Sequence, residues 1–327
     1  MVKFFKSDKI ILKSNKLIKF IIIILIYIYY NSLFLFKNKN DYEIKLPNKI
    51  EKNLDKYETN IYNNIKYKLI HSNCSRMWGN QREFLNGIVR KFKPKKILEI
   101  GVAEGGSSIV ILNAIKTIKN SHLYSIDLSK HEKIGFCVKN IFPNLLENWS
   151  LFTGNSAAKF IEEIGNGIDM VFFDSSHFEP GEILDFLIVF PFLKKGAIVA
   201  FHDIGNQITR AGKRQEFAPY LIFNIIRGKK YLPSGRGILY KDIGAIKLED
   251  NQQKYINDYF RALGGQWQYF PEAEDINLIR NLFKKYYNND CVTIFEEASS
   301  FNRKFVKRHP VETNVRYKFD SNSLIII

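Results

Sequence analysis

The stretch "ILEIGVAEGGSS", residues 97–108, joins an apolar run to a helix-like segment through a glycine-rich turn. Glycine permits a tight strand-to-helix turn and a close approach of the backbone to a ligand. The spacing G-x-x-x-G-G differs from the dinucleotide fingerprint, and glycine turns are common between strands and helices. The stretch therefore predicts a strand, a turn and a helix, and it leaves the ligand open.

Four more strand-like runs follow and are separated by helix-sized segments. The runs are "HLYSID" (122–127), "WSLFTG" (149–154), "IDMVFFD" (168–174) and "GAIVAFHD" (196–203). Strands that alternate with helices predict a doubly wound α/β fold with a parallel sheet. Ligands bind such sheets at the carboxyl ends of the strands. Asp174, His177, His202 and Asp203 fall at or just beyond such ends and are candidate site residues.

Asp127 ends the strand that follows the glycine turn, about twenty residues after Gly106, the spacing of a ribose-binding acid. A carboxylate there can accept hydrogen bonds from both hydroxyls of a ribose. The alternative is a helix N-cap.

Taken together, the motifs resemble the class I S-adenosylmethionine-dependent methyltransferases. More narrowly, they are similar to the small-molecule O-methyltransferase branch that includes cephalosporin-hydroxylase-like and macrolide-sugar methyltransferase proteins. The resemblance covers about residues 78–248 and implies a mostly parallel Rossmann-like sheet with an antiparallel closing strand. It rests on Glu99-Ile100-Gly101, Gly105-Gly106-Ser107, Asp127, Gly154-Asn155-Ser156, Asp174 to His177, and His202-Asp203.

The resemblance implies S-adenosylmethionine as the cofactor. The turn from Gly101 to Gly106 would hold its methionine part and Asp127 its ribose, while Asn155 and Ser156 would lie beside the adenine. Family members often have an acid where Asn155 stands. The expected cofactor-binding residues are Glu99, Gly101, Gly105, Gly106, Ser107, Asp127, Asn155 and Ser156.

By position, the resemblance makes Asp174 and Asp203 metal ligands and His177 the general base, with His202 a further catalytic candidate. Carboxylates suit Mg²⁺. His202 departs from the pattern, because metal-dependent sugar members have two adjacent acids there, and imidazole suits Mn, Fe or Zn better than Mg. A different metal, or no metal with His202 as a second base or donor, stays open. So do structural roles for Asp174 and His202 and a turn-capping role for His177.

The segment 20–36 is uncharged and has lysines on both sides, so we expect an uncleaved single-pass membrane anchor. A buried or interfacial helix is the alternative. Charge does not decide the topology, but the cofactor is made in the cytosol, and we therefore expect a cytoplasmic catalytic domain.

The chain has 327 residues and a net charge of +16, which invites a nucleic-acid interpretation. Membrane flanks explain part of this charge, since eight lysines and one aspartate lie in residues 1–40. Three cysteines without a C-x-x-C pattern argue against a disulfide framework or a zinc ribbon, and we expect structural thiols.

The expected organisation has five parts. The parts are a basic tail (1–19), the anchor (20–36), a linker with a helical lead-in (37–75), the cofactor-binding domain (76–250) with an insert at about 205–232, and a helical C-terminal extension (251–327). Arg210, Lys213 and Arg214 in the insert could contact an anionic substrate or a neighbouring subunit of a homo-oligomer. In the extension, Trp267, Tyr269 and Phe270 are expected in the core rather than in a substrate pocket.

The expected function is methyl transfer to a hydroxyl of a small molecule or glycan precursor. An inactive scaffold that keeps the fold for binding is the alternative, and a nucleic-acid methyltransferase is the weaker rival, because no N/D-P-P-Y/F-type motif is present.

Overall fold

The computed structural model describes residues 56–72, 74–205, 218–233 and 242–306. The basic tail, the segment 20–36 and most of the linker lie outside these residues. So do Arg210, Lys213 and Arg214 of the expected insert, and nothing in the structure bears on their expected contacts.

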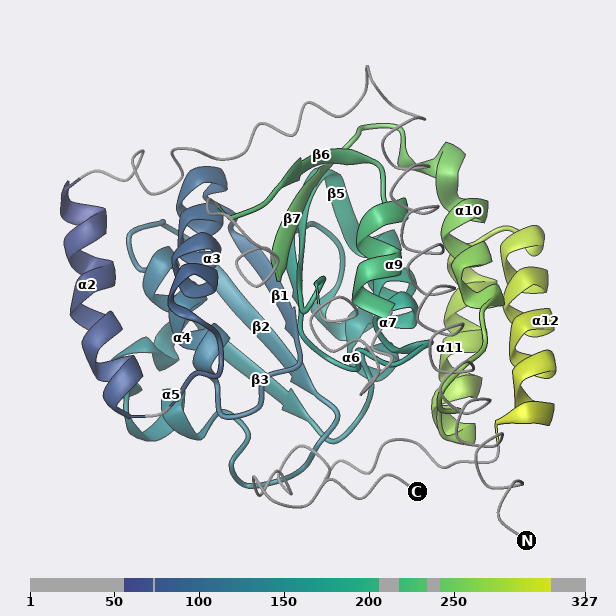
Figure 1. Cartoon of the computed structure of the whole chain (residues 1–327), viewed down its shortest axis with the longest axis horizontal. Coiled ribbons are helices and arrows are strands. Elements are labelled where there is room, and N and C mark those ends of the chain that lie inside the picture. Colours follow the sequence, from purple (N-terminus) through teal and green to yellow (C-terminus); the bar gives the residue numbers. More distant parts are fainter. Residues whose placement is uncertain (1–55, 73, 206–217, 234–241, 307–327) are drawn as a thin grey trace, which may run out of the picture. The chain divides into compact units, whose positions relative to one another are not determined.

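One sheet of seven strands forms the centre of the domain, in the order β3-β2-β1-β4-β5-β7-β6 (Figure 1). The strands β1 to β5 are parallel, while β7 runs antiparallel to both β5 and β6. This confirms the predicted doubly wound sheet with an antiparallel closing strand. The bounds are β1 Lys96–Ile100, β2 His122–Asp127, β3 Trp149–Thr153, β4 Ile168–Phe173, β5 Leu193–His202, β6 Gly228–Tyr231 and β7 Ile243–Leu248.

Helices follow the strands and continue beyond the sheet into the C-terminal extension (Figure 1). Short 3-10 helices lie at Pro143–Asn148, Phe190–Phe192, Gln252–Tyr255 and Ala262–Gly264. The α-helices are α2 Lys56–His71, α3 Gly79–Phe92, α4 Gly106–Ile115, α5 Phe136–Asn140, α6 Ala157–Ile164, α7 Gly181–Val189, α9 Ala218–Ile225, α10 Ile256–Arg261, α11 Ala273–Tyr286 and α12 Asn289–Phe305.

Two hydrophobic cores cover the two faces of the sheet. Successive side chains of a strand point to opposite faces, so Ile97 of β1 packs with one core and Leu98 with the other. The first core takes its helical residues from α2, α3, α4 and α5, and the second from α6, α7, α9 and the extension helices α10, α11 and α12. The extension therefore shares a core with the sheet. Trp267 is 2% exposed, as expected for a core residue.

The runs "RGILYKD" (236–242) and "GAIKLED" (244–250) are strand-like and predict an antiparallel pair at the closing edge, and the structure differs from this prediction in one respect. The second run forms β7, but its partner is β6, which lies in the expected insert. Residues 234–241 lie outside the described part of the chain. No strand pattern marks β6, because "GKKY" is short and basic. Lysine is typical of edge strands, which it protects from further pairing.

The prediction of free structural thiols is wrong for two of the three cysteines. Cys74 and Cys137 form a disulfide, with their Cα atoms 5.9 Å apart. Cys291 is free and buried. The two bonded residues are 63 positions apart in the sequence, and only the packing of the segment before α3 against α5 brings them together.

The predicted localisation is also corrected. Among the residues that the structure describes, no helix has both the length and the apolar character needed to cross a bilayer. The segment 20–36 on which the single-pass anchor rested is not among them, and we do not retain the anchor.

Candidate functional site

Neighbouring strands β4 and β5 bring the predicted catalytic residues together. Phe173 of β4 lies opposite Phe201 of β5, so Asp174 and His202 follow them at the same level of the sheet. Asp203 comes next and has a φ of 55°, which is uncommon for a residue with a side chain. Nδ1 of His202 lies 3.2 Å from Oδ2 of Asp203 and 3.7 Å from Oδ1 of Asp174. The parallel register thus forms the predicted cluster.

His177 lies between carboxylates on both sides of its ring. Its Nε2 is 2.7 Å from Oδ2 of Asp203 and 3.8 Å from Oδ1 of Asp174. Its Nδ1 is 3.1 Å from Oε1 of Glu182, whose side chain is fully buried. Both ring nitrogens therefore have an acidic partner.

The charges of this cluster stabilise protonated imidazoles. Burial lowers the pKa of His202, but the negative charges of Asp203 and Asp174 outweigh it and raise the pKa to about 9. Burial likewise opposes the charged form of His177, and Asp203 and Glu182 raise its pKa well above the usual value. Burial raises the pKa of Asp203, yet the two histidines hold it well below its usual range. The surroundings of the two imidazoles therefore favour their protonated forms beside the Asp203 carboxylate.

Three acids near the cluster were not predicted from the sequence, namely Glu182 and Asp242, which are buried, and Asp185, which is partly buried. Glu182 and Asp185 lie one turn apart on α7, and Asp242 precedes β7, where its Oδ1 accepts a hydrogen bond from the Gly205 amide at 2.6 Å. Burial raises the pKa of Glu182, and it raises those of Asp185 and Asp242 to about 7. The sequence signal that could have revealed Glu182 and Asp185 is the presence of two acids, three residues apart, on an otherwise apolar helix.

The predicted cofactor turn lies directly against the catalytic cluster. The amide of Asp174 donates to the carbonyl of Ile100 at 2.9 Å. Gly101 has a φ of 91°, and a Cβ there would lie 1.9 Å from the carbonyl oxygen of Asp174. Cβ atoms at Gly105 and Gly106 would meet Val138 at 2.9 Å and the carbonyl of Cys74 at 2.5 Å. The protein's own packing therefore already requires these glycines, whatever the turn binds.

Asp127 holds this turn in place. Its Oδ2 accepts hydrogen bonds from the amides of Val102 at 2.9 Å and Ala103 at 3.0 Å, and its Oδ1 accepts one from Ser129 at 2.9 Å. A carboxylate offers about four acceptor sites, so about one remains for a ribose hydroxyl. The structure thus gives Asp127 a structural role beside the predicted one.

Glu99 lies beneath the turn rather than at its surface. Its side chain is fully buried, and Oε2 accepts hydrogen bonds from the hydroxyls of Ser108 and Ser125, both at 2.6 Å. Burial raises the pKa of Glu99 to about 7, although the hydroxyls of Ser107 and its two partners lower it. Ser107 is itself buried in the first turn of α4. Glu99 supports the turn from the core side.

The two residues expected beside the adenine follow β3. Asn155 is partly exposed, and Ser156 is the N-cap residue of α6. The hydroxyl of Ser156 donates to Oδ1 of Asp275, on helix α11 of the extension, at 2.6 Å. The extension thus contacts the expected cofactor side, a contact that local sequence patterns did not indicate.

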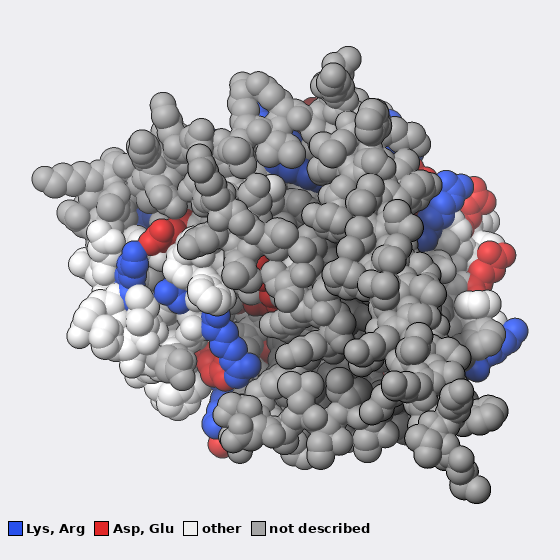
Figure 2. Space-filling model, in the orientation of Figure 1, with Lys and Arg blue, Asp and Glu red and all other residues white. Residues whose placement is uncertain are grey.

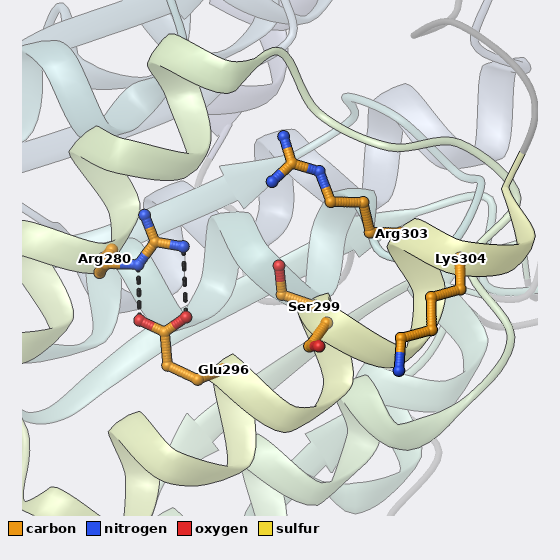
Figure 3. Close-up of a pocket in the computed structure, with 6 residues that line it drawn as sticks. Arg280, Glu296, Ser299, Arg303 and Lys304 are labelled. Atoms are coloured by element: carbon orange, nitrogen blue, oxygen red, sulfur yellow. Dashed lines mark hydrogen bonds and ion pairs between the residues drawn. The ribbon is translucent and has the colours of Figure 1, made fainter.

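A hollow of about 260 Å³ also lies in the C-terminal extension (Figure 3). It is lined by Arg280, Glu296, Ser299, Ser300, Arg303 and Lys304. Arg280 makes a bidentate pair with Glu296, and the guanidinium of Arg303 lies 5.6 Å from the Phe270 ring. It contains no predicted site residue, and two of its three cations already have partners within the protein.

On the face shown in Figure 2, the visible basic residues of the described part are interspersed with acidic ones and do not form a continuous basic stripe.

A comparison with known protein families finds a match over part of the chain. A family model described as "Methyltransferase domain" matches residues 98–204. This confirms the resemblance predicted from the sequence, and with it the enzyme class, a methyltransferase. No curated protein matches the chain.

Solved structures give distant likenesses. An O-methyltransferase from Bacillus cereus in complex with SAH is 16% identical, with a TM-score of 0.43 over 59% of this chain and 91% of that one. TomG, the O-methyltransferase from Streptomyces achromogenes involved in tomaymycin synthesis, is also 16% identical, with a TM-score of 0.43 over 60% and 91%. A putative caffeoyl-CoA O-methyltransferase from Staphylococcus aureus is 17% identical, with a TM-score of 0.44 over 59% and 100%.

Proposed function

We propose that this chain, whose residues 98–204 match the methyltransferase domain family, transfers a methyl group from S-adenosylmethionine to a hydroxyl of a small molecule or glycan precursor. One observation carries the proposal. The cluster of Asp174, His177, His202 and Asp203 lies in direct backbone contact with the glycine turn, through the hydrogen bond from the Asp174 amide to Ile100 and the close approach of Asp174 to Gly101. Groups that can take up a proton thus adjoin the expected cofactor turn.

S-Adenosylmethionine supplies an electrophilic methyl group: as the acceptor oxygen bonds to the methyl carbon, the bond from that carbon to sulfur breaks and its electron pair stays on sulfur. The hydroxyl proton must pass to a base. On the chain's side, Asp127 has about one acceptor site left for the ribose, and Asn155 and Ser156 lie at the end of β3. We assign these residues to the cofactor.

His177 is our proposed base, with a condition that its surroundings impose. Asp203 and Glu182 raise its pKa, so the imidazole is protonated at neutral pH and cannot accept a proton in that state. It becomes a base only after it loses its own proton. Activity that depends on neutral His177 should therefore increase with pH on the alkaline side of 6.5.

A divalent cation also fits the residues present. One ligand atom each of Asp174, His177 and Asp203 lies within 4.8 Å of the others. Two carboxylates with one imidazole suit Mn²⁺, Fe²⁺ or Zn²⁺ better than Mg²⁺. When bound, such a cation lowers the pKa of a hydroxyl and thereby eases loss of its proton. His177 is then a ligand, and the role of base would pass to another group of the cluster, with His202 as our candidate.

Calorimetric titration of the full chain with S-adenosylmethionine tests the proposal, with and without Mn²⁺. We expect micromolar binding that Asp127→Ala weakens at least tenfold, whereas the matched exposed variant Asp250→Ala binds as the wild type does. Equal binding by Asp127→Ala would remove Asp127 from the cofactor site. No binding by the wild type under either condition would overturn the proposed function.

The inactive scaffold remains the second candidate, and one observation favours it. The packing of the protein accounts for Gly101, Gly105 and Gly106 without any ligand. A scaffold would keep the fold and bind no S-adenosylmethionine, so the same titration separates the two functions.

A further inference from the structure

The C-terminal extension holds the loop that carries His177. The amide of Gln268 donates to the carbonyl of Glu179 at 2.8 Å, and the side-chain Oε1 of Gln268 accepts from the amide of Glu179 at 3.0 Å. One glutamine therefore binds both backbone polar groups of Glu179. Such a pair of bonds fixes both the position and the orientation of that peptide segment.

The residues directly before Gln268 are held by a buried asparagine of α12. Asn302 is fully buried, and its Oδ1 accepts from the amide of Trp267 at 2.8 Å. Its Nδ2 donates to the carbonyl of Gly265 at 3.1 Å and to that of Ala298 at 3.0 Å. The side chain of Trp267 is 2% exposed and donates to the Leu263 carbonyl at 2.9 Å. These hydrogen bonds tie the segment that leads into Gln268 to helix α12.

Glu179 is two residues from His177 and three from Glu182, so its placement affects both. In the ring of His177, Nε2 lies 2.7 Å from Oδ2 of Asp203, and Nδ1 lies 3.1 Å from Oε1 of Glu182. Within the loop, the amide of Glu182 donates to the Ser176 carbonyl at 3.1 Å, and the amide of Ala218 donates to the His177 carbonyl at 3.1 Å. These bonds hold the loop near the sheet, while Gln268 holds its outer part.

We propose that Gln268, supported by Asn302, is a positioning residue for His177, and that the C-terminal extension thereby sets the geometry of the acceptor side. Both residues lie beyond the part of the chain that matches the methyltransferase domain, residues 98–204. The catalytic meaning of this inference rests on the proposed function. The geometric part, that Gln268 fixes the ring of His177, does not.

The test compares Gln268→Met, which keeps the side-chain length but loses the acceptor oxygen, with Gln268→Glu, which keeps an acceptor, and with Gln253→Met on an exposed residue. The readout is the set of imidazole N–H resonances in protein labelled with ¹⁵N-histidine, assigned to His177 through His177→Gln. A second readout is the dissociation constant of S-adenosylmethionine. Thermal melting checks that each variant folds.

We expect Gln268→Met to shift or broaden the His177 N–H resonances, Gln268→Glu to restore them, and Gln253→Met to leave them unchanged, while the dissociation constant stays within about twofold. If Gln268→Met does not fold, Asn302→Asp gives the second test, since it keeps the acceptor for Trp267 and loses the two donor bonds. Unchanged His177 resonances would overturn the inference. A variant that loses both cofactor affinity and melting temperature would also overturn it, because a general structural role predicts such a combined loss. If the wild type binds no cofactor, the proposed function fails while the resonances still decide this inference.

Discussion

The cofactor side and the acceptor side of the sheet are built from different chemical groups. At the ends of β1 and β2, backbone amides and glycines form the turn, and the carboxylate of Asp127 accepts hydrogen bonds from three amides. At the ends of β4 and β5, charged side chains hold one another, and Asp203 is shared by two imidazoles. The first region can be altered mainly by changing shape, and the second by changing charge. This difference predicts separate responses to mutation.

Asp203→Asn should have the largest effect of the four substitutions. It should impair the acceptor side and leave the cofactor side intact. Losing the central negative charge lowers the pKa of His202 from about 9 toward its usual value. The change also removes the partner that lies 2.7 Å from Nε2 of His177 and one of the three candidate metal ligands, so we expect methyl transfer to fall about a thousandfold, or about 4 kcal/mol in the barrier. Labelled methyl transfer to the acceptor and the NMR titration of His202 measure these effects. Cofactor affinity should change less than twofold, as for the surface control Asp250→Asn; a large loss of affinity would contradict the separation.

Gly101→Ala should break the contact between the two regions. The added Cβ would lie 1.9 Å from the Asp174 carbonyl, in a backbone conformation with φ of 91°. Overpacking and strain together should cost roughly 4 kcal/mol of the free energy of unfolding and abolish cofactor binding. Urea unfolding and calorimetry measure this. Gly264→Ala is the matched control, since no atom lies within 4 Å of its added Cβ.

Cys74→Ser should weaken the cofactor side and spare the acceptor side. The Cys74 carbonyl packs on Gly106, and the amide of Cys137 donates to the Glu104 carbonyl at 2.9 Å, so the disulfide joins two segments that flank the turn. Loss of this cross-link should cost roughly 3 kcal/mol of the free energy of unfolding. Reduction of the wild type should have the same effect, and so should reduction of Cys291→Ser, which keeps the disulfide, whereas Cys74→Ser should not respond to reductant. A wild type insensitive to reductant would refute this prediction.

Glu99→Gln, on the cofactor side, should have the smallest effect of the four substitutions. The pKa of Glu99 is raised from 4.5 to about 7, so the folded state binds its proton more tightly than the unfolded state does. The stability that this proton contributes is present below pH 4.5 and is lost as the pH rises to about 7. Between pH 5 and 8 the wild type should lose roughly 2 kcal/mol that the variant keeps. Urea unfolding at both values measures this, with the exposed Glu163→Gln as control.

Local patterns in the sequence were sufficient for the sheet and for the residues at its strand ends. Alternating apolar runs located β1 to β5, and the parallel order then placed Asp174, His202 and Asp203 side by side. The edge strand β6 was missed because its four residues carry no apolar period.

The residues missed at the site depend on tertiary contacts. Glu182 becomes a partner of His177 only through the shape of the loop between them, and Gln268 approaches Glu179 from 89 residues away. The Cys74–Cys137 pair likewise has no short spacing to reveal it. The contacts that folding creates, rather than the residue types, set the limit of the prediction.

The disulfide also has a topological consequence. Its closure makes a covalent ring of the chain from Cys74 to Cys137, and this ring contains α3, β1, α4, β2 and the glycine turn. A single proteolytic cut anywhere within it leaves both fragments linked. Cleaved protein should therefore keep its full mass, apart from one added water, until a reductant is added. The segments that form the expected cofactor site therefore stay covalently joined even after one peptide bond within the ring is cut.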